Sequence, residues 1–329
     1  MRISNRHAAV IRRLRSLPDQ VSPEFPGAIR ALVEELAQPE DTLRQIVELD
    51  RLKGPVRFYA LYGLLLRLRR EERHSEYEHT IVRYGKHFSK EPYFPTFLAI
   101  SERNRGDAAS LRKAIVYSLQ AAADMPDVAG VVHQVAAFTA EYLERRLDPV
   151  SKEEIAEAER YANKAITLSD GRIAHYHETK ARISGIRQEF DSARASVTRA
   201  IELEPKQGRD YHRRLTQYQA TRIRIDLMEQ QSRWAEMQES SRHELTEFKN
   251  QQLQLLGILA AVIALIATGS NIASQAKTAD AIVLIEVMAG TVVIVFTAFS
   301  LMTSRAWWRV LISFLVGVSL IVIPHVFGR

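Results

Sequence analysis

The spacing of apolar residues predicts helices along most of the chain. Up to about residue 250, apolar side chains recur at every third or fourth position, and alternating runs of β-branched residues are scarce. A period near 3.6 residues is typical of helices with one buried face, whereas half-buried strands alternate with a period of two. The predicted fold class is therefore all-α, and the first helices are expected at 26–36, 40–49 and 56–70.

Long apolar windows in the last third of the chain predict a different environment. They span residues 253–273, 281–302 and 308–327. About 20 apolar residues in a helix cross the hydrocarbon core of a bilayer. The alternative is three core helices of a soluble domain, but this part of the chain offers little other polypeptide to bury them. We expect three C-terminal transmembrane helices.

The residues between these windows predict their orientation. The connector 303–309 combines two arginines with a tryptophan pair, which act as a cytoplasmic-side signal and as interfacial anchors, respectively. The expected anchors are Arg305, Trp307, Trp308 and Arg309. We therefore expect an integral membrane protein with its N-terminal part in the cytoplasm and its C-terminus outside.

The most regular helical pattern lies between residues 156 and 205. In its second half, small residues recur where two helices would touch, an aromatic residue lies between the helices and a proline closes the unit. These residues are Ala181, Ala193, Ala200, Phe190 and Pro205. The stretch resembles a tetratricopeptide repeat. The resemblance implies two antiparallel helices that stack on neighbouring pairs in an α-solenoid.

Three earlier stretches carry weaker versions of this spacing. Their key residues are Ala158, Ala162 and Ala165, then Ala114, Ser118 and Ala121, and then Thr80, Tyr84 and His87. The resemblance covers about 55–230, although Gln188 and Glu189 stand where the family usually has Gly-Asp. A generic helical bundle with alanine-rich contacts is the alternative.

These patterns divide the chain into four segments. Residues 1–54 are expected to form an N-terminal helical cap. Their first 17 residues hold five arginines and no acid, which fits a basic first helix better than an organellar transit peptide. Residues 55–205 form the repeats, 206–250 a long amphipathic connecting helix, and 251–329 the membrane domain.

The connecting helix carries an apolar seam. Between Pro205 and Gly257 the chain contains no other proline and only Gly208, so an unbroken helix is expected. The seam consists of Ile223, Leu227, Trp234, Met237, Leu245, Phe248 and Leu255. It either folds back on the repeats or pairs with a second copy as a short coiled coil. The second alternative implies a homo-oligomer.

A binding groove follows from the repeat resemblance. Stacked helical hairpins form a curved wall suited to peptides or proteins. In the family, groove residues come from the first helix of each pair, which here points to His175, Glu178 and Arg182. The alternative is that each of these residues belongs to an ordinary solvated helix face.

Polar residues inside the predicted spans form a second candidate site. Ionisable groups in a membrane tend to face a bundle interior or a wet cavity, because desolvating a charge is costly. With the expected orientation, four polar residues, of which Glu286 and His325 are ionisable, lie at similar depth: Ser270, Asn271, Glu286 and His325. They form either an ion path or local hydrogen bonds without further function.

The composition excludes several chemistries. The chain has no cysteine, which excludes disulfides, thiol nucleophiles and cysteine-bound metals. No phosphate-loop, dinucleotide-binding or metalloprotease motif is present. The net charge is +6, but no basic run is interleaved with aromatic residues as in nucleic-acid surfaces. We therefore expect no enzyme, no metal, no cofactor and no nucleic acid partner.

Two functions remain open. The first is a membrane-anchored module that binds a protein or peptide partner through its groove. The second is an effector that senses a partner and permeabilises the membrane. The segment Leu253–Leu265 resembles membrane modules of bacterial defence effectors. That resemblance implies a bacterial inner membrane, with lipid and further copies of the chain as additional partners.

Overall fold

The computed structural model describes residues 5–36, 39–52, 54–146, 150–207, 210–273, 277–303 and 307–327. All regular secondary structure in these residues is helical, which confirms the all-α prediction. The chain divides into two compact units, Met1–Arg233 and Trp234–Arg329.

The first five helices form the aromatic core of the first unit. They are α1 (Asn5–Arg15), α2 (Phe25–Glu35), α3 (Pro39–Val47), α4 (Val56–Arg70) and α5 (His74–Phe88). Helix α4 contacts each of the other four helices, and ten of its fifteen residues are buried. The Phe25 ring lies 4.7 Å from that of Tyr59 and 5.2 Å from that of Tyr62. Large aromatic side chains therefore hold this end of the unit together.

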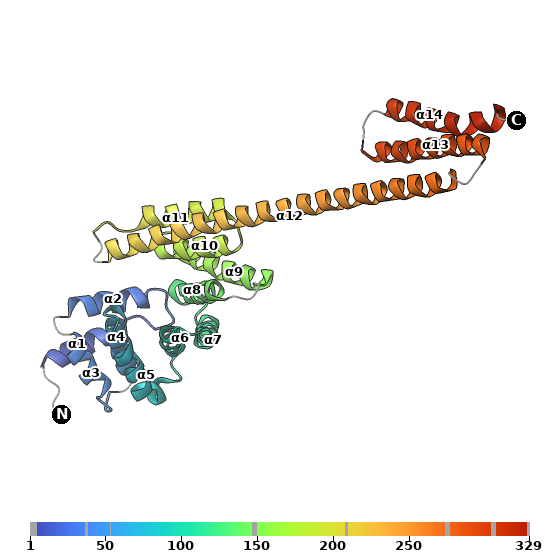
Figure 1. Ribbon diagram of the computed structural model, residues 1–329. Helices are drawn as coiled ribbons and strands as arrows, with labels where there is room; N and C mark the ends of the chain where they lie inside the picture. Colours follow the sequence, from blue (N-terminus) through green and yellow to red (C-terminus); the bar gives the residue numbers. More distant parts are fainter. Residues whose placement is uncertain are drawn as a thin grey trace. The chain divides into compact units, whose positions relative to one another are not determined.

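Six further helices continue the unit as successive hairpins. They are α6 (Phe94–Arg105), α7 (Ala108–Asp124), α8 (Ala129–Arg145), α9 (Lys152–Leu168), α10 (Ala174–Ile186) and α11 (Phe190–Leu203). Each helix packs against the next in the chain, and α8 also contacts α6 and α10 (Figure 1). This stacking is compatible with a helical solenoid.

Local signals determine several helix ends. Gly106 adopts a φ of 80° and ends α6, a backbone conformation that favours glycine. The Asp107 side chain then accepts a hydrogen bond from the Ser110 amide at the start of α7. At α9, Ser151 and Glu154 form a reciprocal capping box.

The predicted small residues lie at the helix contacts. Six alanines have no exposed surface: Ala158, Ala162, Ala165, Ala181, Ala193 and Ala200. Ala114, Ser118 and Ala121 are equally buried. In α5, Thr80 and Tyr84 are buried as expected, but His87 is exposed and Phe88 takes the buried position. The apolar ring of Phe88 gains more from burial than the polar imidazole would.

Helix α12 (Tyr211–Ala273) joins the expected connecting helix to the first apolar window without a break. Its first turns pack on the hairpin stack through Tyr218 and Ile225, which are 1% and 2% exposed and touch the alanine-lined core of α10 and α11. The expected seam is wrong as the packing face, because Ile223 and Leu227 are 60% and 52% exposed. The helix folds back on the repeats with a different face.

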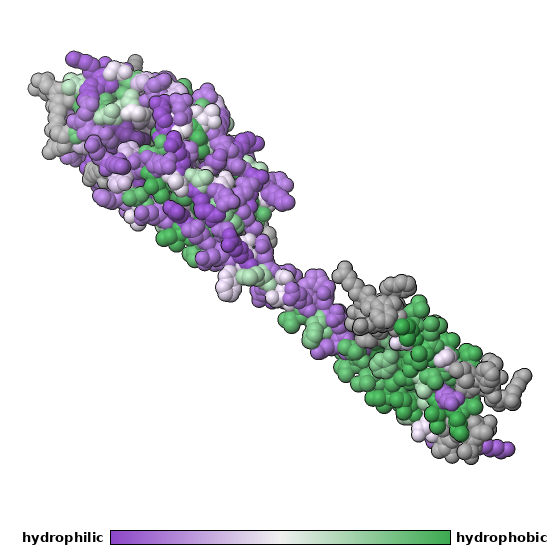
Figure 2. Space-filling view, turned by 90° about the horizontal axis from the view of Figure 1, so that it is seen from above, coloured by the Kyte–Doolittle hydropathy of each residue, from purple (hydrophilic) through white to green (hydrophobic). Residues whose placement is uncertain are grey.

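The second unit contains the rest of α12, α13 (Thr278–Thr303) and α14 (Trp307–Phe327). Within the described residues, α12 alone has an apolar stretch long enough to cross a membrane, rather than the three helices expected. The described apolar stretches of α13 and α14 are Ile285–Thr297 and Leu311–Val322, shorter than the roughly 20 residues that a crossing needs. Hydrophobic residues dominate the surface of this unit, and hydrophilic residues that of the first (Figure 2).

Two glycines bring α13 and α14 together. A Cβ atom on Gly290 would lie 2.7 Å from the carbonyl oxygen of Gly317, and one on Gly317 would lie 2.8 Å from a side-chain carbon of Ile294. Only glycine permits such a close approach of two helix backbones. Gly290 and Gly317 therefore lie at a close contact between these two helices.

Candidate functional site

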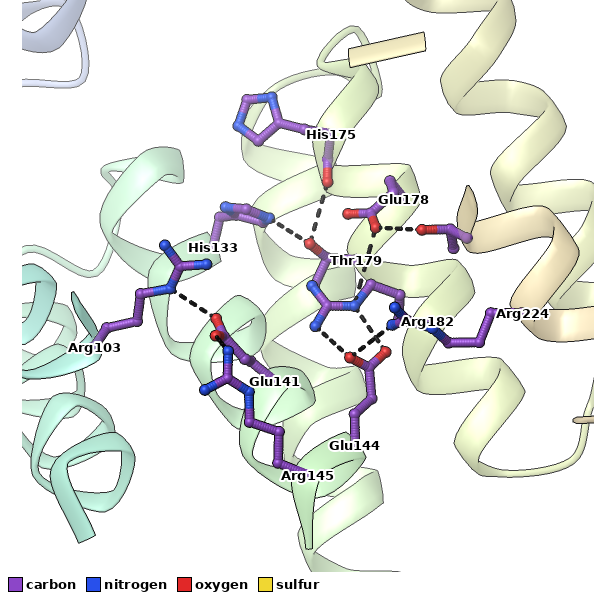
Figure 3. Close-up of polar contacts among 11 residues, drawn as sticks. Arg103, His133, Glu141, Glu144, Arg145, His175, Glu178, Thr179, Arg182 and Arg224 are labelled. Atoms are coloured by element: carbon purple, nitrogen blue, oxygen red, sulfur yellow. Dashed lines mark hydrogen bonds and ion pairs between the residues drawn. The ribbon is translucent and has the colours of Figure 1, made fainter. Parts of the chain in front are cut away.

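The first unit contains a cavity of about 660 Å³ between α8, α10 and the first turns of α12, which we call the charged groove. Its walls carry four arginines and three glutamates among a few apolar and polar residues (Figure 3). The charged residues are Arg103, Glu141, Glu144, Arg145, Glu178, Arg182 and Arg224.

Helical spacing explains why these side chains converge. Residues three or four apart share a helix face. On α8 the groove residues are Glu141, Leu143, Glu144 and Arg145, and on α10 they are Glu178, Arg182 and Ile186. On α12 they are Gln217, Ala220, Thr221, Arg224 and Met228. Helices α10 and α12 thus each turn one stripe toward the groove, and α8 contributes its last turn.

A two-pronged ion pair lies at the centre of the groove. The Nε and one terminal nitrogen of Arg182 donate to the two carboxylate oxygens of Glu144, at 2.9 and 2.7 Å. Arg224 donates to the same carboxylate at 3.1 Å. Burial raises the pKa of Glu144, but the hydrogen bond and charge of Arg182 outweigh burial, so its pKa is lowered overall. Glu144 therefore remains ionised and links α8, α10 and α12.

Glu141 gathers a second pair of arginines. Its carboxylate accepts hydrogen bonds from Arg103 at 2.8 Å and from Arg145 at 2.6 Å. The Glu141 side chain is 10% exposed, whereas those of Arg103 and Arg145 are 46% and 48% exposed. The guanidinium groups are thus held in place by a buried acid while half of their surface faces solvent.

Glu178 is the most buried acid of the groove. It is 3% exposed and accepts a hydrogen bond of 2.8 Å from the hydroxyl of Thr221 on α12. Burial raises the pKa of Glu178, although the nearby Arg182 charge opposes this shift. The neutral acid is therefore favoured at this position more than at an ordinary surface glutamate.

His175 belongs to a neighbouring half-buried cluster and does not line the groove. Its ring lies 5.0 Å from that of His133 and 4.6 Å from that of Tyr176. The His133 ring stacks on Tyr176 at 4.2 Å and hydrogen-bonds to the Thr179 hydroxyl at 2.9 Å. Burial, reinforced by the positive charge of Arg214, lowers the pKa of His175 to about 3. Burial also lowers the pKa of His133. Both rings are therefore neutral at pH 7.

The predicted groove residues are thus only partly brought together. Glu178 and Arg182 lie on the groove wall, and their role in binding a partner stays a prediction. Sequence reasoning missed the contributions of α8 and of α12, above all Glu144 and Arg224. The available signal was the recurrence of charged residues at helical spacing in 141–145 and of polar residues in 217–224.

The predicted membrane cluster is described only in part. Ser270 and Asn271 lie in the last turn of α12, and Glu286 lies in α13; all three side chains are exposed. The side chain of His325 lies outside the described residues. So do Arg305 and the side chains of the expected anchors Trp307, Trp308 and Arg309. Their roles stay predictions.

The chemistry of the groove is that of ionic binding. Guanidinium groups recognise carboxylates through paired hydrogen bonds, as Arg182 does with Glu144. Within the described part of the chain, no group of three or more His, Asp or Glu side chains is placed to hold a metal ion. The described residues also give no support to the resemblance of Leu253–Leu265 to membrane defence effectors. No protein-family model matches the chain, and no curated protein matches its sequence.

Proposed function

We propose that this chain is a membrane-attached binding protein whose charged groove holds a carboxylate-bearing segment of a protein or peptide partner. The groove belongs to hairpins α4–α11, which we assign to tetratricopeptide-like repeats. The buried alanines of α9, α10 and α11 support that assignment.

The charge balance of the groove carries the proposal. Two arginines donate to Glu141, and two donate to Glu144. Each of these acids neutralises one positive charge, so each cluster keeps an excess of one. The third acid, Glu178, lies 4.0 Å from Arg182 and offsets at most one more charge, so four arginines against three glutamates still leave a positive surplus. A groove with surplus guanidinium charge favours a partner with carboxylates over a neutral or basic one.

The rim arginines have the exposure that a ligand contact requires. Arg224 is 56% exposed, and Arg103 and Arg145 are nearly half exposed. Arg182 is only 14% exposed and already pairs with Glu144 through both oxygens. We therefore assign partner contact to the three rim arginines, and to Arg182 the role of holding the wall.

The second unit attaches the protein to a membrane. Buried residues make up only 11% of the most apolar window of α12, so its apolar surface needs another cover. Helices α13 and α14 have 26 and 21 residues, about 39 and 31 Å at 1.5 Å per residue, against roughly 30 Å of hydrocarbon. We propose that all three helices cross, with the N-terminal unit on the cytoplasmic side, where Arg305 and Arg309 also lie.

Peptide binding tests the groove. The full-length protein in detergent is applied to an array of glutamate-rich, glutamine-rich and lysine-rich peptides. We expect the glutamate-rich peptides to be retained and Arg224→Glu to weaken their binding at least about tenfold, because a like charge replaces an attractive one. The matched control is Arg199→Glu on α11. Arg199 is 54% exposed, pairs with Glu202 and does not line the groove.

Two results would contradict the proposal. One is preferential retention of lysine-rich peptides, which would show that the glutamates of the groove, and not its arginines, contact the ligand. The other is an equal loss of binding in Arg199→Glu and Arg224→Glu, which would show a response to overall charge rather than to the groove.

A further inference from the structure

The second unit exposes an apolar stripe on α12 that no other described part of the chain covers. Its members follow helical spacing and are 50–71% exposed: Trp234, Met237, Leu245, Phe248 and Leu255. Trp234, Phe248 and Leu255 lie at multiples of seven residues from one another, with Ser241 between them. Large apolar side chains in such a row mark an interaction surface.

The heptad spacing indicates the shape of what covers the stripe. An apolar repeat of seven residues keeps the same helix face in contact with a second helix that supercoils around it. Residues 234, 241, 248 and 255 then occupy one core position over about 31 Å of helix. None of these four residues is charged. The stripe therefore fits another helix rather than a flat surface.

The membrane surface is an unsuitable cover. Helix α12 continues without a break from Trp234 into its apolar window. A helix can lie flat on a membrane and then enter it only if it bends sharply, and such kinks have local causes such as proline. No proline occurs in α12. The segment 234–250 therefore projects from the bilayer, with Trp234, Met237, Leu245 and Phe248 of the stripe in water.

We propose that the stripe pairs with the same stripe of a second copy in a parallel, in-register coiled coil. This rests on the membrane attachment proposed above, because copies that insert in the same direction present α12 parallel and at the same height. Each stripe residue then meets its own counterpart, Trp234 with Trp234 and Phe248 with Phe248. A second copy already carries apolar residues at the same spacing, whereas a helix of different sequence would need a complementary apolar stripe of its own.

Three polar residues, Ser241, Glu244 and Gln251, occupy core positions and set the strength and alignment of the pair. Ser241 meets Ser241, and a single polar residue in a core position favours one alignment at a cost in stability. Glu244 takes the other core position of that heptad, where two copies repel. Leu245 lies one residue beyond and covers the gap. The coiled coil is therefore of moderate stability, and Glu244→Leu is expected to strengthen it.

Disulfide cross-linking tests the proposal directly, because the natural chain has no cysteine. Ser241→Cys replaces one small exposed side chain by another and places the only thiol in the core position. The matched control is His243→Cys, an exposed residue two positions along and thus on the opposite face. Membranes carrying each full-length variant are oxidised, and the covalent dimer is measured.

The proposal expects Ser241→Cys to give at least about fivefold more dimer than His243→Cys, because counterpart residues in the core lie within disulfide range. Adding Phe248→Asp should abolish that excess. Equal dimer from both cysteines, or none from Ser241→Cys, would overturn the pairing. Loss of the protein from the washed membrane fraction would instead refute the membrane attachment. The two failures are therefore distinguishable.

Discussion

At the scale of the residue, two arginines that share the Glu144 carboxylate differ in burial. Arg182 and Arg224 both donate to its carboxylate, but their side chains are 14% and 56% exposed. Burying an ion pair is expensive, but removing one partner afterwards is strongly destabilising, because the remaining buried charge has no water to replace its partner. An exposed pair is screened by solvent and contributes little.

Removing the two side chains should therefore have unequal effects. We expect Arg182→Leu to lower the free energy of opening of α10 by about 3 kcal/mol, since it leaves Glu144 and Glu178 without their buried cation. Arg224→Ala should lower it by less than about 1 kcal/mol. Hydrogen exchange of the α10 amides in the full-length protein measures both. Equal effects would show that Arg182 does not hold the groove wall.

His133 and His175 make the stability of the first unit sensitive to acid. In the folded unit, burial keeps His175 neutral, with its pKa lowered from 6.5 to about 3. Below pH 6.5 the histidine of the unfolded chain binds a proton, whereas that of the folded chain does not. Its contribution to the free energy of unfolding is therefore fully present above pH 6.5 and is lost as the pH falls toward 3. Each such histidine contributes up to about 1.4 kcal/mol per pH unit in this range.

His175→Phe should reduce this sensitivity. Phenylalanine keeps an aromatic ring beside His133 and Tyr176 but binds no proton. Between pH 7 and pH 5, we expect the loss of unfolding free energy to be about 2 kcal/mol smaller in the variant. Urea unfolding followed by circular dichroism at both pH values checks this. An unchanged difference would assign the acid sensitivity to other groups.

At the scale of the element, alanines allow the hairpins to pack closely. Ala181 on α10 and Ala193 on α11 belong to one buried cluster, and neither has exposed surface. The 3.6-residue period made these positions visible in the sequence, because small residues recur where two helices must touch. Helix α12 was less predictable, since apolar residues occur on two of its faces and periodicity does not rank them.

A larger side chain at one of these contacts should push α10 and α11 apart. We expect Ala181→Leu to destabilise α10 and α11 by about 2 kcal/mol, because extra methyl groups have no space in a packed contact. The control is Ala195→Leu, at an exposed position of α11, which should change stability by less than about 0.5 kcal/mol. Hydrogen exchange of both helices distinguishes the two. A neutral Ala181→Leu would contradict the close packing.

At the scale of the whole molecule, the two units have surfaces of opposite character. The first unit has hydrophilic residues over most of its surface and its own aromatic and alanine cores. The second unit exposes large apolar side chains along its helices. The hydrophobic effect therefore favours folding of the first unit in water, and it favours the membrane attachment that we propose for the second.

The two units should partition accordingly when produced separately. We expect residues 1–233 to remain in the supernatant and to be helical by circular dichroism. The full chain should sediment with membranes and resist carbonate extraction. Release of the full chain by carbonate would show that α12 does not span the bilayer. Aggregation of residues 1–233 would show that its first turns of α12 need the rest of the helix to fold.

The sequence by itself determined that the chain is helical and placed several helix ends. The predicted helix 56–70 coincides with α4, and the second predicted span ends at 302, one residue before the end of α13 at Thr303. These features are local, because helix formation depends on residues within a few turns. The buried alanines could be predicted for the same reason, since a contact between adjacent helices requires small residues at short sequence distance.

Only the tertiary structure decided which helix faces meet. The groove unites Arg103, Glu144, Arg182 and Arg224 from four helices spread over more than 100 residues, and no local pattern encodes that meeting. It also decided that Tyr218 and Ile225, rather than Ile223 and Leu227, pack on the stack. The reason is physical: a helix with two apolar faces buries the one whose shape fits its neighbour, and that fit exists only once the neighbour has folded.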